Sequence, residues 1–140
     1  NSTAADLQEP TVEDLMKSDP EVERWRSGAE EDLKRAGDTP LARAFLALVI
    51  GDWAEARRCF EEATRTTPDR PEGWNFLAKL AAREGQWPEV VEWCTQGWDR
   101  DRGFTLHLSN RAAAWFMIGE QRARAGKEYE ESFRKACTDC

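Results

Sequence analysis

The chain has little of what catalytic and metal sites are built from. Its 140 residues include a single histidine, His107, and only four cysteines. Without a second histidine, the common acid–base and metal arrangements lose their main residue, and a lone histidine is expected at the surface or at a rim. The glycine-rich phosphate loops and the GxSxG nucleophile motif are also missing from the sequence. We therefore predict a protein that is not an enzyme and that needs no cofactor and no metal ion.

Basic charge and long apolar runs are also scarce. The chain carries 20 basic and 27 acidic side chains, a net charge of −7. Nucleic acids and anionic membrane surfaces both favour a basic footprint, so neither is an expected partner. No apolar run approaches the roughly 20 residues of a membrane-spanning helix, which predicts no membrane insertion. These features favour a cytoplasmic protein, although the start at Asn1 leaves open a removed signal or membrane anchor upstream.

The N-terminal part differs from the rest of the chain. Residues 1–37 contain ten acidic and five basic side chains, and so hold most of the negative charge. Residues 1–10 are small and polar and are predicted to form a flexible tail. Residues 11–37 are predicted to be helical, because Asp19–Pro20 is a good helix start and apolar residues then follow at helical spacing up to Gly37. We expect this segment to pack on the helices that follow.

Three glycines, Gly51, Gly85 and Gly119, stand 34 residues apart. Tryptophan follows the first two by two residues, and alanine precedes all three by seven. Small and aromatic residues recur around them at three- and four-residue steps, which is the spacing of one helix face. Glycine readily ends a helix, because it tolerates the left-handed conformation. The spacing therefore predicts an all-α protein built from units of helix, tight turn and helix.

The conjunction of these residues resembles a known repeat. The residues that carry the resemblance are Trp74, Leu77, Ala78, Gly85 and Trp87 in one unit, and Ala44, Gly51, Trp53, Ala56, Phe60, Ala63 and Pro68 in the unit before it. The pattern is similar to that of the tetratricopeptide repeat (TPR) family. The resemblance implies a right-handed superhelical stack over residues 38–140, with units at about 38–68, 71–102 and 105–137, and an extra N-terminal helix before it.

The third unit departs from the repeat after Gly119. Polar residues, Gln121 and Arg124, stand where apolar ones are expected, and the apolar spacing resumes five residues late. The late residues are Tyr129, Phe133 and Ala136. Two interpretations remain open: an insertion of about one helical turn, or two helices fused through Gly119.

In the TPR family, the first helices of successive units line a concave groove that binds peptides. Asp38, Glu72, Ala82 and Ala113 occupy groove positions here, and the partner contacts that we predict are Leu41, Phe45, Leu48, Asn75, Lys79, Leu106, Ser109 and Phe116. The groove would be apolar at both ends and polar in the middle, which suits a peptide or helix with two hydrophobic anchors. Alternatively, the N-terminal helix covers Leu41, Phe45 and Leu48.

One well-known variant of that groove is missing. The family's carboxylate clamp, which grips the acidic tails of heat-shock chaperones, needs Lys, Asn and Arg at set positions. This chain has Leu41, Phe45, Phe76, Leu106 and Asn110 there. The resemblance therefore does not extend to a co-chaperone for such tails.

The cysteines have two different settings. Cys59 and Cys94 fall on predicted second helices, where buried cysteine behaves as a small hydrophobe. Cys137 and Cys140 form a CxxC pair at the C-terminal end, which is half of a zinc site and closes a helix rather than opening one. An incidental or inter-chain disulfide is the favoured interpretation of this pair.

Taken together, these patterns predict a non-catalytic module that binds a protein or peptide partner. One alternative is a chaperone of the kind that holds type III secretion translocators, since small acidic three-repeat TPR proteins have that role. Another is a scaffold or assembly subunit that associates with copies of itself. The sequence names neither the partner nor the oligomeric state.

Overall fold

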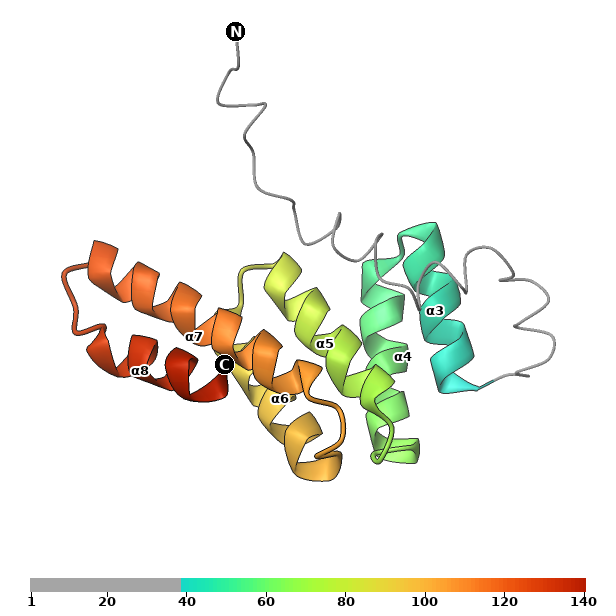
Figure 1. Ribbon diagram of the computed structural model, residues 1–140. Helices are drawn as coiled ribbons and strands as arrows, with labels where there is room; N and C mark the ends of the chain where they lie inside the picture. The colour runs from blue at the N-terminus through green and yellow to red at the C-terminus, as the bar shows by residue number, and fades with distance from the viewer. Residues whose placement is uncertain (1–38) are drawn as a thin grey trace, which may run out of the picture.

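The computed structural model describes residues 39–140, which form six α-helices (Figure 1). The predicted tail 1–10 and the predicted N-terminal helical segment 11–37 lie outside the described residues. The helices are α3 (Pro40–Ile50), α4 (Trp53–Thr66), α5 (Pro71–Arg83), α6 (Trp87–Arg100), α7 (Leu106–Arg124) and α8 (Glu130–Asp139). They follow one another in sequence order from one end of an elongated stack to the other. The prediction of an all-α repeat stack is confirmed for this part of the chain.

The helix ends follow the local sequence. Pro40 begins α3 behind Thr39, whose side-chain oxygen accepts a hydrogen bond from the Ala42 amide at 3.1 Å. Gly51 ends α3 in the left-handed conformation, with φ 82°, and Gly85 has φ 71° in the turn between α5 and α6. The two glycines therefore make the tight turns that their spacing predicts.

Gly119 has a different role. It lies inside α7, and the turn to α8 falls instead at Gly126, which has φ 71°. Gly119 is buried against α8, where an added Cβ would come within 2.5 Å of the Phe133 ring. The missing side chain thus lets the two helices approach. The helix continues through Gly119, but α7 and α8 remain separate helices, so the unit is lengthened and the two helices are not fused. The turn moves by seven residues, about two helical turns rather than the one expected.

Two apolar clusters hold the units together. The first joins α3, α4 and α5 around three phenylalanines. Phe60 and Phe76 stack with ring centres 5.1 Å apart, and Phe45 meets both rings edge-on at 5.5 and 5.0 Å. The second cluster joins α5, α6 and α7 through small residues, with Ala78, Ala81, Val90, Cys94 and Ala114 at its centre. Each cluster therefore spans one helix pair and the first helix of the next.

The expectation for His107 is wrong. Its side chain is 0% exposed and lies between α6 and α7. The ring stands 4.8 Å from that of Phe104 and sits over Gly97, where an added Cβ would come within 2.7 Å of the imidazole. A glycine on the facing helix therefore makes room for this buried histidine, which the sequence did not reveal.

Candidate interaction surface

The predicted contacts on α3 belong to the core. Phe45 is 1% and Leu48 5% exposed, and Leu41 packs against the edge of the same cluster. Their cover is α5, which contributes Phe76, Leu77 and Leu80 to this cluster. The first helix of one unit thus packs on the first helix of the unit before it. As a result, Phe45 and Leu48 are not available at the surface as partner contacts.

The predicted contacts on α5 are also engaged within the protein. Asn75 is buried, and its side-chain oxygen accepts a hydrogen bond from the Asn110 amide group of α7 at 3.0 Å. The Lys79 ammonium lies 5.2 Å from the centre of the Phe76 ring, a cation–π distance. Asn75 therefore contributes to the contact between α5 and α7, while Lys79 contacts a ring of its own helix.

The predicted contacts on α7 are the ones at the surface. Leu106 and Ser109 are exposed, and Phe116 is 49% exposed. On the helix, Ser109 and Phe116 lie on the side opposite Asn110 and Ala114, which contact the preceding unit. The exposed side of α7 is therefore the side turned away from α5 and α6.

The 34-residue period explains the difference between these helices. Leu48, Ala82 and Phe116 occupy the same position in successive units, and they are 5% exposed, half-buried and 49% exposed, respectively. In the first two units the next first helix packs on this side. Within residues 39–140 no further helix packs on the third. The α7 surface is thus the uncovered equivalent of two internal interfaces.

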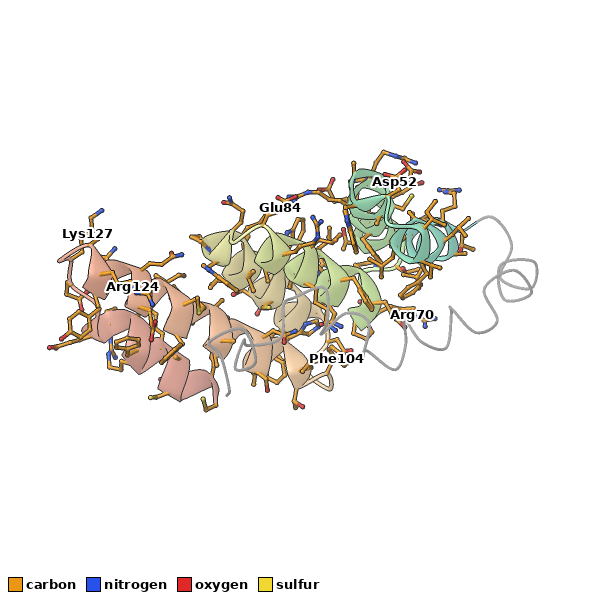
Figure 2. The ribbon with its side chains drawn as sticks, turned by 90° about the horizontal axis from the view of Figure 1, so that it is seen from above. Asp52, Arg70, Glu84, Phe104, Arg124 and Lys127 are labelled. Atoms are coloured by element: carbon orange, nitrogen blue, oxygen red, sulfur yellow. The ribbon has the colours of Figure 1, made fainter. Side chains whose placement is uncertain are left out.

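A groove runs along this uncovered side, between α7 and α8, with a volume of about 600 Å³. Its lining residues are Ser109, Ala112, Ala113 and Phe116 of α7, and Phe133, Ala136, Cys137 and Cys140 of α8. No acidic or basic side chain is among them. We call this surface the α7–α8 groove. The helices α7 and α8, which form this groove, lie at one end of the stack. Arg124 and Lys127 mark that end in Figure 2, and Asp52 marks the other.

Aromatic rings form one part of the groove. Phe116 and Phe133 stand with ring centres 5.5 Å apart, and Tyr129 meets Phe133 edge-on at 5.6 Å. The α8 half was missed by sequence reasoning, because the period breaks before it. The late apolar spacing of Phe133 and Ala136 was the available signal, since it marks a helix face next to α7.

The other side of α7 carries charge instead. There Arg111 donates two hydrogen bonds to the Asp139 carboxylate, at 2.7 and 2.9 Å, and a third to the Thr95 hydroxyl at 3.0 Å. The Lys135 ammonium stands 4.3 Å from the Trp115 ring centre. These contacts tie the end of α8 to α6 and α7. They also leave the α7–α8 groove as the uncharged side of this helix pair.

The cysteines divide as their positions predict. Cys59 and Cys94 are both buried, and burial raises the pKa of the Cys94 thiol to about 12, so it stays protonated. Cys137 and Cys140 are exposed at the groove. In the part of the chain that the structure describes, no three histidine, cysteine or acidic side chains are grouped as metal ligands would be. The disulfide interpretation of the CxxC pair stays a prediction.

The described helices define an α-helical repeat protein, in which each helix pair packs on the next. Residues 40–80 match the model of the tetratricopeptide repeat family, and the six helices agree with TPR-like repeats. The resemblance inferred from the glycine spacing is thereby confirmed, and it supports protein–protein interaction as the general function. No curated protein matches the chain. Among the described helices, none has the length and apolar character needed to cross a bilayer.

Proposed function

We propose that the protein is a non-catalytic interaction module that binds an apolar segment of a protein partner in the α7–α8 groove. The observation that carries this proposal is the exposure of Phe116 at a position that is covered in the two preceding units. Aromatic side chains are enriched at the centres of protein–protein interfaces, where they act as anchors. Leu106 and Ser109, predicted as contacts from the sequence, lie on the same helix and extend this surface.

The groove favours an uncharged partner surface. A charged side chain placed there would lose water without gaining an opposite charge, because no acidic or basic residue lines the groove. An apolar helix face or an extended segment with apolar anchors meets this requirement. On this proposal, burial of the partner's apolar side chains would contribute most of the binding free energy.

A pair of matched variants tests this function. Phe116→Asp places a charge in the groove, and Leu46→Asp places one on α3, where Leu46 is 40% exposed. The full chain and both variants would be used as bait, with captured proteins quantified by mass spectrometry. We expect Phe116→Asp to weaken partner binding by at least about tenfold, and Leu46→Asp to leave it unchanged. Equal partner capture by all three proteins, with helicity intact by circular dichroism, would contradict the proposal.

A further inference from the structure

The α7–α8 groove lies on the side of α7 that corresponds to a contact between helices in the two preceding units. The equivalent side of α3 is covered by Phe76, Leu77 and Leu80 of α5, and that of α5 by α7. The outer side of the last described unit presents Phe116, Phe133 and alanines. The surface therefore has the composition of a contact between units.

The charge of this end permits contact between identical copies. The whole chain has a net charge of −7, which opposes self-association. Residues 106–140, which hold both helices of the groove, contain six basic and five acidic side chains. Two copies that meet at this end therefore bring together regions of nearly zero net charge, and the groove lining adds no charge of either sign.

The shape of the groove also suits its own copy. Phe116 projects as a half-exposed ridge, while Ser109 and Ala113 on the same side of α7 are small and exposed. A two-fold axis that brings two such surfaces together can seat the Phe116 ring of each copy over the small residues of the other. Two-fold contacts of this kind use one self-complementary patch on both copies and close at two.

We propose that the α7–α8 groove is occupied by the α7–α8 groove of a second copy, which makes the protein a two-fold dimer. This inference rests on the proposed function, since it names the partner of the same groove. It places Cys137 and Cys140 of both copies at the dimer interface, because both line the groove. The α7 helices of the two copies would then contact each other across the axis through the same face.

The mass of the full chain in solution tests the dimer. We expect sedimentation over a concentration series to approach twice the chain mass of 16.0 kDa and to stop there. Phe116→Asp and Ala113→Arg should each weaken self-association by at least about tenfold, which corresponds to 1.4 kcal/mol. Ala113 is exposed, so its variant is expected to fold even if Phe116→Asp does not. Leu46→Asp, at the opposite end of the stack, should leave the dimer intact.

Crosslinking locates the contact. A bis-maleimide that joins two thiols should link Cys137 or Cys140 of one copy to its counterpart in wild type and in Leu46→Asp. The link should disappear in Ala113→Arg and in the double variant Cys137→Ser/Cys140→Ser. Cys59 and Cys94 are buried and should not contribute.

Several outcomes would overturn the dimer. A monomeric wild type, a mass that rises beyond two copies, a dimer that survives both groove variants, or one that Leu46→Asp abolishes would each do so. A rising mass together with sensitivity to Leu46→Asp would indicate head-to-tail assembly through α3. If the wild type is monomeric but Phe116→Asp still loses a captured partner, the dimer is wrong and the proposed function stands. If no variant changes mass or partner capture, both are wrong.

Discussion

His107 is the one histidine of the chain, and its imidazole is fully buried. Neither ring nitrogen has a hydrogen-bond partner among the described residues. Burial lowers the pKa of His107, because the charged imidazolium would lose its hydration, and the nearby Asp101 carboxylate opposes this only in part. The ring therefore acts as a neutral, space-filling group between α6 and α7, in the place that Gly97 leaves open.

This burial predicts a pH-dependent stability. Because the folded-state pKa of His107 is lowered, the unfolded chain binds the proton more readily. The free energy of unfolding should stay level above the unfolded pKa of about 6.5 and fall as the pH drops below it. The loss should stop once the pH is below the folded pKa. Urea denaturation at about pH 7.5 and about pH 5.5 checks this, since few other side chains titrate in that window. His107→Leu should remove most of the difference, and an unchanged difference in that variant would contradict the prediction.

At the scale of elements, α8 is held by a partly buried ion pair. The carboxylate of Asp139 is 8% exposed, and it accepts both hydrogen bonds from Arg111 near the end of the helix. By contrast, the pair between Glu131 and Arg134, one turn of α8 apart, is largely exposed. Buried pairs depend on both partners, whereas exposed pairs contribute little.

We therefore expect Asp139→Asn to loosen α8. The change leaves Arg111 partly buried without its counter-charge and should lower the free energy of unfolding by about 1–3 kcal/mol. Glu131→Gln, on the same helix, should have a much smaller effect, because its ion pair is exposed. Hydrogen exchange should rise in the α8 amides of Asp139→Asn and stay unchanged in α3 and α4. Equal effects of the two substitutions would show that the Arg111 pair does not hold the helix.

The turns between the helices could be predicted only in part from the sequence. Gly51 and Gly85 predict two turns correctly, because the left-handed conformation of a tight turn favours glycine at that position itself. Gly119 fits the same period, but the prediction that it forms a turn is wrong. It is glycine because α7 and α8 approach closely at Phe133. Close approach depends on the packing partner rather than on neighbouring residues in sequence. The length of α7 and the position of Gly126 therefore needed the structure.

Over the full stack, the sequence likewise predicted one part of the candidate surface and not the other. The repeat positions on the first helices were located from the sequence, and two of them, Ser109 and Phe116, line the α7–α8 groove, whose α8 half was not predicted. Which of them stay exposed depends on which described helices pack on them. Phe45 occupies a predicted groove position and is buried against α5, whereas Phe116 contacts only Phe133 of α8 among the described rings and stays 49% exposed. Periodicity defines equivalent positions but does not say which of them a neighbouring helix covers.

Substitutions at Phe45 and Phe116 therefore test how strongly the helix pairs of the stack depend on one another. Phe45 contacts Phe60 of α4 and Phe76 of α5, so it joins the first helix pair to the second. Phe45→Ala should lower the free energy of unfolding by about 3–5 kcal/mol. Phe116→Ala should cost about 1 kcal/mol or less, because half of its ring already faces water.

The width of the urea unfolding transition is a more specific test of this coupling than the loss of stability. In repeat proteins each unit is stabilised by its neighbours, so loss of one interface lets the units on either side unfold separately. Urea denaturation of Phe45→Ala, followed by tryptophan fluorescence, should then broaden and show a lower m value, as expected when two-state behaviour fails. The m value of Phe116→Ala should match the wild type, since no internal interface is changed. A sharp transition with an unchanged m value in Phe45→Ala would mean that the helix pairs unfold as one cooperative unit, and that the first phenylalanine cluster does not by itself couple them.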